Sequence, residues 1–514
     1  MTLLLLSLAA LGLAAAEPRS LPPLEGTVHG PVLEWQVSTR DYRGDPYDVQ
    51  AFARFVHADG DAYTVPLFHA GDHAWRLRFT APRVGHYDVV TQSRHPGLDG
   101  ITTSLAVAPN PDPDASSFMV AQGDAFAVLA GDGSEARRLV YHVYQRHPSA
   151  SDPAGLETPA HLSADPAIRG PHIEALLDEV EAHGKQALFL MVGNNWFSWP
   201  REYDEPVPDD EPRREYPDPV TFGIIEDLLE RARARGLFVH LWAWGDSENR
   251  NSPDGFGGIN SAVDVRLQYY IAGRLGSIPN WTMSLGYDLE EWVTPAEARA
   301  WHATLTGFNT LPRLIGAREF GTWRDQTFEL GRDKLGYFSN DLRPESDFFE
   351  EALTLFDQGH GLPVLFERRF LHTRDGVWDQ DTTRRALWQF TLAGGAGAIW
   401  GVLWGDGPPY PEPAQGRTYR DFWQARFDHA FERPTRLIDG TIALHGTEPD
   451  RAMFYAEATQ RVSLDLRDAR GSLPAVAVDT RAPYAEVEIG PLSASDEAWV
   501  APYESDWVVA VGAF

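Results

Sequence analysis

The middle of the chain repeats one unit, in which an amphipathic stretch is followed by a glycine and then by a short apolar run. The unit is clear at residues 171–196, "PHIEALLDEVEAHGKQALFLMVGNNW", and again at residues 222–247, "FGIIEDLLERARARGLFVHLWAWGDS". An apolar period near 3.6 residues predicts a helix, and the short run that follows it predicts a buried strand. Helices that alternate with buried strands form βαβ units, in which the strands are parallel. This repetition constrains the fold more than any other feature of the sequence.

Further strands are predicted downstream, each preceded by a helix-compatible segment. They are "NWTMSLGYD", "PRLIGARE", "KLGYFSND", "LPVLFER" and "GAIWGVLWGD". The first strand lies either in "FAVLAGDGS" or in "RRLVYHVYQ", and the sequence does not separate these two candidates. With one of them the count is eight strands between about residues 124 and 406, which predicts a (β/α)8 barrel over residues 112–434. A doubly wound sheet is the competing fold, but no Gly-x-Gly-x-x-Gly turn follows an early strand.

The segments on either side of this region alternate apolar and polar residues with a period of two. Residues 25–110 contain runs such as "VLEWQVSTR" and "HAWRLRFTAPRVGHYDVVTQS", and the linker "APNPDPDAS" follows them. Residues 435–514 contain "RAMFYAEA", "RVSLDLRD" and "DWVVAVGAF". Short alternating strands between turn residues are typical of β-sandwiches. We therefore expect a multidomain chain, α/β plus all-β, whose TIM barrel is flanked by an N-terminal Ig-like β-sandwich and a C-terminal β-sandwich.

Residues 1–16, "MTLLLLSLAALGLAAA", predict a signal peptide. The apolar stretch is too short to span a membrane comfortably, and it ends in three alanines that suit a signal peptidase. We expect cleavage before Glu17 and a secreted or periplasmic protein that is not held in a membrane. No Lys or Arg precedes the apolar stretch, which leaves a tethering helix as the alternative.

Charge and composition argue against several classes of function. The net charge of −30, from 44 basic and 74 acidic residues, disfavours nucleic acid and anionic lipid as partners. The chain has no Cys, which excludes thiol catalysis and cysteine-bound metals. His142 and His147 are five residues apart, and neither His-Glu-x-x-His nor Gly-x-Ser-x-Gly occurs. We expect no metal and no cofactor, and the oligomeric state stays open.

A carboxylate ends the fourth predicted barrel strand, "NWTMSLGYD". The face of Thr282, Ser284 and Asp288 is small and polar and suits the barrel interior. The other face, which ends at Tyr287, is large and apolar and suits the surrounding helices. The alternation therefore predicts that Asp288 lies at the mouth of the barrel.

Glu367 ends the seventh strand, "LPVLFER", in the same phase as Pro363 and Leu365. It should lie at the same mouth as Asp288, because the ends of parallel strands meet there. Glycoside hydrolysis needs two carboxylates, of which one protonates the leaving oxygen and the other attacks or orients water. We predict that Glu367 is the nucleophile and Asp288 the acid. A salt bridge to the neighbouring Arg368 or Arg369 is the structural alternative for Glu367.

Glu290 and Glu291 lie beyond the fourth strand, where alternation no longer predicts direction. Glu291, next to Trp292, is the second candidate for the catalytic acid. In the alternative interpretation both carboxylates stabilise the start of a helix in "EEWVTPAEARAW".

Aromatic and amide side chains gather at the predicted strand ends. Sugar rings present apolar C–H faces and hydroxyl edges, so a glycan cleft combines indole platforms with amide and carboxylate partners. A single buried tryptophan in the core is the alternative for each of these aromatic residues. His240 shares the phase of Trp242 and Trp244, which predicts an interior hydrogen-bonding position. The candidate substrate-binding residues are Asn194, Asn195, Trp196, Trp242, Trp244, Asp246, Tyr287, Trp400 and Trp404.

The run "RRALWQFTLAGGAGAIWGVLWGDG" after "GLPVLFERRF", together with the closing "DWVVAV", resembles secreted bacterial glycoside hydrolase-like proteins of clan A. These have a DUF5060-type N-terminal sandwich, a DUF4038 (apiosidase-like) or related barrel, and a C-terminal collagen-binding-like sandwich. The resemblance covers nearly the whole chain after the signal peptide. It implies a retaining enzyme, with the acid/base in a Gly-Asn-Glu-like motif after strand four and a nucleophilic Glu after strand seven. Gly286-Tyr287-Asp288 takes the place of that motif, and Glu367 takes the place of the nucleophile.

This chain departs from the family at strand four. Tyr287 replaces the Asn that contacts the sugar 2-hydroxyl, and Asp288 is shorter than Glu. These departures leave Glu291 as a possible acid and an inverting mechanism as an option. The leading hypothesis is a glycoside hydrolase that cleaves a plant or algal polysaccharide or its oligosaccharides. The alternatives are a non-catalytic glycan-binding protein and a polysaccharide lyase, for which Tyr287, His142 and Arg318 are candidate groups.

Overall fold

The structure is a computed structural model, and it describes the greater part of the chain. The described residues are 19–40, 42, 44–112, 117–131, 135–148, 154–201, 214–245, 251–287, 289–319, 336–340, 347–358, 361–367, 379–402, 412–427, 431–448 and 450–514.

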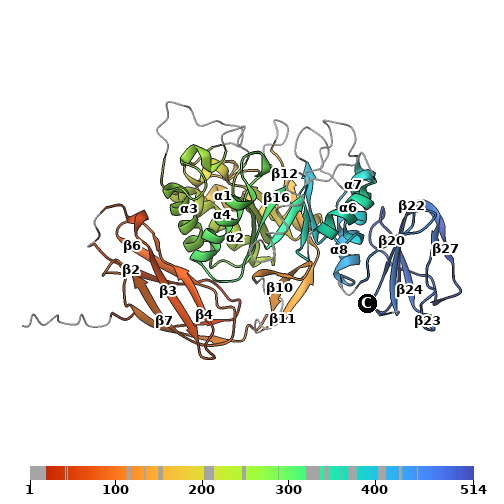
Figure 1. The fold of residues 1–514 in the computed structure, drawn as a ribbon, viewed down its shortest axis with the longest axis horizontal. Helices are drawn as coiled ribbons and strands as arrows, with labels where there is room; N and C mark the ends of the chain where they lie inside the picture. Colours follow the sequence, from red (N-terminus) through yellow and green to blue (C-terminus); the bar gives the residue numbers. More distant parts are fainter. Residues whose placement is uncertain are drawn as a thin grey trace, which may run out of the picture.

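Eight parallel strands close into a barrel at the centre of the molecule (Figure 1). In chain order they are β12 (Tyr141–Arg146), β13 (Ala187–Met191), β14 (Phe238–Trp242), β15 (Trp281–Ser284), β16 (Leu314–Glu319), β17 (Tyr337–Asn340), β18 (Val364–Phe366) and β19 (Gly397–Val402). Each strand pairs with the next, and β19 returns to pair with β12, which closes the barrel. The predicted TIM barrel is confirmed, and its first strand lies in the second of the two candidate stretches.

Helices follow the strands and surround the barrel. They are α1 (Pro166–Ala182), α2 (Pro219–Ala234), α3 (Ala262–Arg274), α4 (Pro295–Phe308), α6 (Phe348–Gln358), α7 (Gln380–Leu392) and α8 (Pro413–Gln424). Several begin at a side chain that accepts a backbone N–H of the first turn, such as Asp165, Asp218, Ser261 and Asp379. No helix in the described ranges is both long enough and apolar enough to cross a membrane.

The barrel strands are buried on both faces, which explains their continuous apolar sequence. In β13, Leu188 and Leu190 pack in the cluster formed with the surrounding helices. Phe189 and Met191, which alternate with them, belong to the cluster that fills the barrel interior. Within a strand, the same alternation sets the direction of each side chain.

A small sheet closes one end of the barrel. It consists of β9 (Met119–Gln122), β10 (Ala125–Ala130) and β11 (Glu135–Leu139), so the rejected candidate for the first strand belongs to it. The ring of Phe126 packs against Tyr141 and Tyr337, with centroids 5.3 and 5.6 Å away. Tyr141 and Tyr337 begin their strands. The sheet therefore lies at the N-terminal ends of the strands and leaves the other end for a site.

The N-terminal part is a two-sheet all-β unit with its own core. One sheet contains β1 (Leu24–Thr27), β8 (Thr102–Ala108), β7 (Gly85–Ser93), β3 (Ala51–His57) and β4 (Ala62–Pro66); the other contains β2 (Leu33–Ser38), β6 (Ala74–Phe79) and β5 (Phe68–His69). The hydroxyl of Tyr269, on α3, donates to the carbonyl of Leu67 at 2.7 Å and accepts from the N–H of Ala51 at 2.9 Å. These bonds fix the unit against the barrel.

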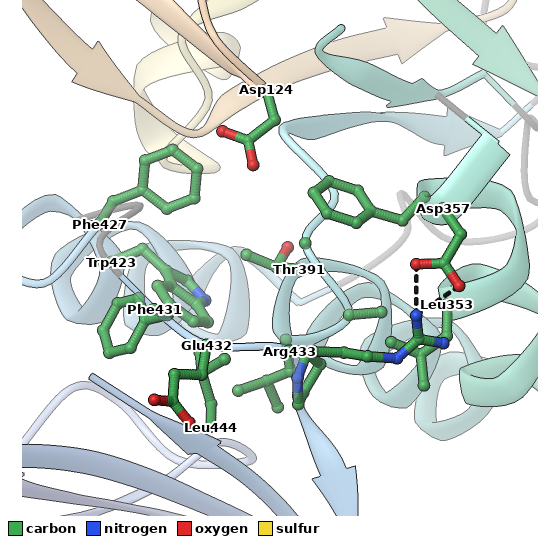
Figure 2. A pocket seen from close by; sticks show the side chains of 15 residues that line it. Asp124, Leu353, Asp357, Thr391, Trp423, Phe427, Phe431, Glu432, Arg433 and Leu444 are labelled. Carbon is green, nitrogen blue, oxygen red and sulfur yellow. Dashed lines mark hydrogen bonds and ion pairs between the residues drawn. The ribbon is translucent and has the colours of Figure 1, made fainter. Parts of the chain in front are cut away.

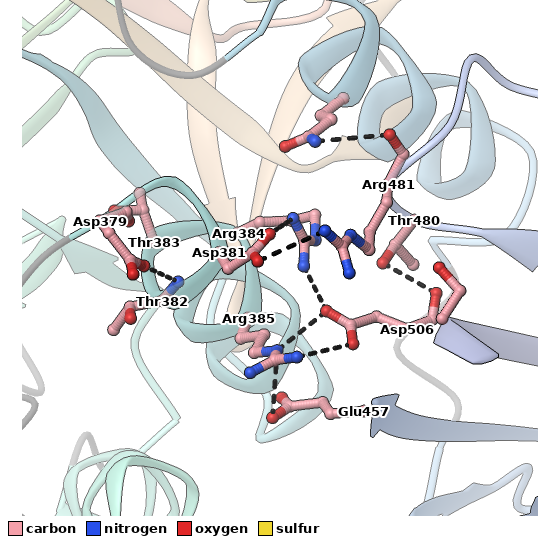
Figure 3. A network of polar contacts seen from close by, with 12 residues as sticks. Asp379, Asp381, Thr382, Thr383, Arg384, Arg385, Glu457, Thr480, Arg481 and Asp506 are labelled. Atoms are coloured by element: carbon pink, nitrogen blue, oxygen red, sulfur yellow. Dashed lines mark hydrogen bonds and ion pairs between the residues drawn. The ribbon is translucent and has the colours of Figure 1, made fainter. Parts of the chain in front are cut away.

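The C-terminal part is also all-β. Its main sheet contains β20 (Thr435–Arg436), β21 (Ile442–His445), β22 (Arg451–Ser463), β27 (Ala498–Gly512), β24 (Ala475–Asp479) and β25 (Val487–Glu488), and β23 (Ser472–Leu473) pairs with β26 (Leu492–Ser493). Asp506, on β27, accepts bonds from Arg384 and Arg385 of α7 (Figure 3). The barrel flanked by two β domains agrees with the predicted fold class.

Candidate active site

Glu367 lies inside the barrel, at the C-terminal end of the seventh strand. It directly follows β18, in which Leu365 belongs to the interior cluster and Phe366 to the cluster with the helices. Continued alternation turns the next side chain inward. The side chain of Glu367 is fully buried, with no exposed area. The carboxylate therefore points into the barrel, as the alternation in the sequence predicted.

Two side chains from other strands approach the same oxygen of Glu367. The hydroxyl of Tyr337, on β17, donates to Oε1 at 3.4 Å. Nε2 of His240, on β14, lies 3.3 Å from Oε1, which is ion-pair distance although the ring is not aligned for a hydrogen bond. The other oxygen, Oε2, has no hydrogen-bond partner among the described residues. One carboxylate oxygen therefore has two polar neighbours, and the second has none to which it is hydrogen-bonded in the described part of the chain.

A polar chain continues from His240 toward the closed end of the barrel. Its Nδ1 lies 2.8 Å from Oγ1 of Thr282, and the hydroxyl of Tyr141 lies 2.9 Å from the same Oγ1. Burial, followed by the charge of Glu367, raises the pKa of Tyr337 well above its ordinary value, and burial also raises the pKa of Tyr141. Both phenols therefore keep their protons and can donate. The interior position predicted for His240 is confirmed.

The fourth strand turns its small polar residues inward, as predicted. Thr282 contacts His240, whereas Trp281 and Met283 pack among the helices. However, β15 ends at Ser284, so strand alternation does not extend as far as the tyrosine and aspartate that follow. Tyr287, expected on the helix-facing side, packs against the interior cluster instead.

Tyr287 forms a stack with two side chains at the ends of neighbouring strands. Its ring centroid is 5.2 Å from that of Trp242, at the end of β14. The guanidinium carbon of Arg318, on β16, lies 4.0 Å from the Tyr287 ring centroid and 5.4 Å from that of Trp242. A cation over an aromatic face is stabilising, and all the more when it is desolvated, as Arg318 is with 2% exposure.

The structure describes only one of the two candidate acids. Asp288 lies outside the described residues. Glu291 is exposed on a short 3-10 turn, Leu289–Glu291. The helix expected to start at Glu290 begins at Pro295 instead, because Thr294 caps it in a reciprocal pair with a glutamate three residues later. Helix N-terminal stabilisation therefore does not account for Glu291.

The predicted amide and indole residues after the second strand brace the loop in which they lie. The side-chain amide of Asn195 donates to the carbonyls of Val192 and Arg201, and the backbone N–H of Asn194 donates to Asn251. The indole N–H of Trp196 donates to the carbonyl of Ala243 at 2.7 Å. Trp196 has no exposed area.

Of the other predicted substrate-binding residues, some are packed in the core and the rest lie outside the described residues. Trp242 has no exposed area, and Trp244 is 2% exposed against Phe197 and Phe256. Asp246 and Trp404 lie outside the described residues. Trp400 belongs to β19, but its side chain also lies outside them. Within the described part of the chain, no group of three His, Asp or Glu side chains could hold a metal ion.

The two histidines weighed as a metal pair point to different partners. His142 lies behind the barrel wall, where its Nδ1 is 3.2 Å from Nζ of Lys185 and its ring packs on Tyr419 of α8. Nε2 of His147 lies 2.8 Å from a carboxylate oxygen of Glu157. His142 therefore does not join Tyr287 and Arg318 at the strand ends.

A mostly apolar cavity of about 240 Å³ lies at the other end of the barrel (Figure 2). Its walls come from the C-terminal turns of α6, α7 and α8, and Asp124 joins them from the β9–β10 turn. Trp423, Phe427 and Phe431 line one side, and Arg433, paired with Asp357, lines another. Because these elements lie at the N-terminal ends of the strands, the cavity is separate from Glu367.

Several members of the site were not selected from the sequence. Tyr141, Thr282 and Tyr337 were not proposed as functional, and Arg318 was considered only for a lyase. The sequence did carry a signal for Tyr337, namely the alternation in "KLGYFSND". Tyr337 and Ser339 share one face of this strand, and a carboxylate at the end of the same strand would also lie on that face.

Comparison with known proteins agrees with this architecture. Residues 31–94 match the family model "Domain of unknown function (DUF5060)". No curated protein matches the chain. A candidate glycoside hydrolase from Bacteroides vulgatus ATCC 8482 has a similar structure, with a TM-score of 0.70 and 14% identity over 96% of this chain and 100% of that chain. A glycoside hydrolase family 5 protein from the same organism has a TM-score of 0.58 and 14% identity over 78% of this chain and 94% of that chain.

At this identity the similarity establishes the fold alone. The chain has the fold of a glycoside hydrolase-like TIM barrel protein with flanking β domains, as the resemblance in its sequence implied.

Proposed function

We propose that this protein is a glycoside hydrolase that cleaves a plant or algal polysaccharide or its oligosaccharides, with Glu367 as the nucleophile. The observation that carries the proposal is the position of Glu367, a buried carboxylate at the C-terminal end of the seventh barrel strand with Tyr337 and His240 on one oxygen. TIM-barrel enzymes keep their catalytic groups at this end of the barrel. The fold shared with glycoside hydrolases supports the same reaction class.

In this mechanism Oε2 of Glu367 attacks the anomeric carbon, and a second carboxyl group protonates the leaving oxygen. The attacking oxygen must be unprotonated and have a lone pair free, which agrees with the lack of a partner for Oε2 among the described residues. Tyr337 and His240 lie against Oε1 and hold it in place. Because Glu367 is fully buried, sugar binding has to open a path to this oxygen.

We assign the acid/base role to Asp288, with Glu291 as the alternative. Retention requires carboxyl groups about 5–5.5 Å apart, and a separation of about 6.5 Å or more would favour inversion. Glu291 is exposed, so it would have to turn toward the barrel when substrate binds. Residues 1–16 form the signal peptide in this proposal, and the enzyme is secreted or periplasmic.

The stack of Arg318 on Tyr287 favours a second candidate function, polysaccharide lyase. A lyase needs a cation to neutralise a uronate carboxylate and a base to remove the neighbouring proton. Arg318 and Tyr287 lie together at the ends of β16 and β15, with the guanidinium carbon 4.0 Å from the ring centroid. Arginine matches the planar geometry of a carboxylate.

The test is activity on a panel of neutral and uronate-containing polysaccharides, measured by reducing ends and by the absorbance of unsaturated products. We expect new reducing ends without unsaturated products. Glu367→Ala should abolish this release, and azide should restore turnover through a glycosyl azide. Glu350→Ala, which changes an exposed glutamate on α6, is the matched control and should remain active. Unsaturated products that survive Glu367→Ala would favour the lyase, and no product from any polymer would favour a glycan-binding protein.

A further inference from the structure

Five buried side chains form one polar chain through the barrel. From the closed end they are Tyr141, Thr282, His240 and Glu367, with Tyr337 beside the last. The successive separations are 2.9 Å from the Tyr141 hydroxyl to Oγ1 of Thr282, 2.8 Å from Oγ1 to Nδ1 of His240, and 3.3 Å from Nε2 to Oε1 of Glu367. The first four have essentially no exposed area. Each comes from a different strand: β12, β15, β14 and the end of β18.

The proton positions along this chain are constrained by its two ends. A carboxylate only accepts, so attraction to Glu367 requires a proton on Nε2 of His240. A neutral ring then has a lone pair on Nδ1, and the hydroxyl of Thr282 must donate to it. The oxygen of Thr282 is left to accept from Tyr141, whose pKa is raised by burial and which therefore keeps its proton. All donors then point toward Glu367.

The opposite arrangement is unfavourable for a geometric reason. If His240 carried its proton on Nδ1, Thr282 would accept from the ring and donate to Tyr141. The lone pair of Nε2 would then face a carboxylate oxygen 3.3 Å away in a buried site. A lone pair and a carboxylate oxygen that face each other without a proton between them repel, and this repulsion is destabilising where water is excluded.

We propose that Thr282 and Tyr141 are positioning residues, which fix the ring of His240 so that Nε2–H faces Glu367. The hydrogen bonds of both lead to the imidazole, and through it to Glu367. The assignment rests on the proposed function in giving Glu367 its role, whereas the proton positions follow from the contacts of a neutral imidazole. The consequence for the reaction is that Oε1 is held in place, while Oε2 has no hydrogen-bond partner among the residues that the structure describes.

The experiment is nitrogen NMR of the full chain labelled with 15N-histidine, in which the His240→Gln variant identifies the His240 signals. In the unmodified protein we expect a protonated Nε2 and a hydrogen-bonded, unprotonated Nδ1. Thr282→Val removes the hydroxyl at nearly constant volume and should shift the Nδ1 resonance and mix the tautomers. Thr282→Ser keeps the hydroxyl and should restore the original pattern. A proton on Nδ1 in the unmodified protein, with or without one on Nε2, or an unchanged spectrum in Thr282→Val, would overturn the proposal.

Kinetics separate this proposal from the proposed function. If the chain hydrolyses a glycoside, Thr282→Val should lower kcat/KM by roughly tenfold or more, as loss of a group that orients a catalytic imidazole does, and Thr282→Ser should recover most of it. If the protein shows no activity but His240 has the expected tautomer, only the proposed hydrolase function is contradicted. An active hydrolase in which Thr282→Val changes neither rate nor spectrum would contradict only the positioning roles.

Discussion

Substitution of Asp506 should strongly weaken the attachment of the C-terminal sheet to the barrel. Its carboxylate, fully buried on β27, accepts from Nε and Nη2 of Arg385 at 2.9 Å each and from the guanidinium of Arg384 (Figure 3). It also accepts from the backbone N–H of Ala458 at 2.7 Å. The two arginines belong to α7, the helix that follows the seventh barrel strand. One carboxylate therefore ties two parts of the molecule together.

The substitution Asp506→Asn removes the charge at nearly constant volume. It removes the buried counter-ion of Arg384, which is only 1% exposed and keeps the half-exposed Asp381 as its remaining partner, and it directs amide hydrogens toward the donors of Arg385. Breaking a buried ion pair by removing one partner costs about 3–5 kcal/mol, because the remaining charge stays buried. We expect a loss of this size in the free energy of unfolding.

Asp347→Asn is the matched control. Asp347 makes a two-pronged pair with Arg436 of β20, at 2.8 and 2.7 Å, but the two side chains are 48% and 31% exposed. Exposed pairs contribute about 0–1 kcal/mol, since water screens them. Both substitutions thus remove a carboxylate charge that joins the barrel to the C-terminal sheet, and they differ in burial and in the number of partners.

The assay is denaturant unfolding of the full chain with hydrogen exchange read separately in α7 and β27, because a chain with several domains does not unfold in one step. Asp506→Asn should lower the protection of both elements far more than Asp347→Asn. Equal losses in the two variants would refute the reasoning that burial sets the magnitude.

The pH dependence of the same variant has a definite sign. Burial raises the pKa of Asp506, but the bonds from Arg385, Ala458 and Arg384 outweigh it, so the pKa lies below its ordinary value. A lowered folded-state pKa contributes stability above the unfolded value of about 3.9, and this is lost as pH falls through the folded value. The gap in stability between the unmodified protein and Asp506→Asn should therefore be full at pH 7 and shrink below about pH 4.

Three further predictions follow from the site and the termini. Asp288→Asn should slow substrates with poor leaving groups far more than activated aryl glycosides, and the same pattern in Glu291→Gln instead would move the acid/base role to that residue. Trp196→Phe loses a buried indole hydrogen bond and should lower the free energy of unfolding by about 1–3 kcal/mol, with KM unchanged; a raised KM would indicate direct contact with substrate. Mass analysis of secreted material should give Glu17 as the first residue, and an uncleaved N-terminus would contradict the signal peptide.

The barrel could be predicted from the sequence because its signal is repeated and local. Each unit pairs an amphipathic helix with a short apolar strand, and the alternation within a strand fixes which side chains point inward. Glu367 was placed correctly for this reason, since it directly follows β18 and no residue intervenes. The same alternation placed Thr282 and Ser284 on the interior face.

Prediction was less successful where the chain leaves a strand. Asp288 lies four residues beyond Ser284, the last residue of β15, and the prediction that Tyr287 faces the helices was wrong. Strand phase is lost within a few residues of the last ladder bond: it still holds for Glu367, the first residue after β18, but not for Tyr287, the third residue after β15. Tyr287 is held by Trp242 and Arg318. These contacts join segments that are far apart in the sequence, so no local pattern predicts them.

The indole residues illustrate a second limit. Trp196, Trp242 and Trp244 occur at strand ends, where a sugar platform would be expected, yet each is almost fully buried. A tryptophan packed in a loop and one that faces a cleft have the same sequence context, because both need apolar neighbours. Only the arrangement of Phe197, Phe222 and Ala243 around them distinguishes the two.

The role of Glu367 is tested most directly by trapping the covalent intermediate. The protein is incubated with an activated 2-deoxy-2-fluoro glycoside of whichever sugar the substrate panel identifies, and the digested protein is examined by mass spectrometry. A retaining enzyme with this nucleophile should carry one added fluoroglycosyl group on the peptide that contains Glu367, and Glu367→Ala should carry none. A label on another carboxylate, or unlabelled protein that still hydrolyses the parent glycoside with inversion, would contradict the account.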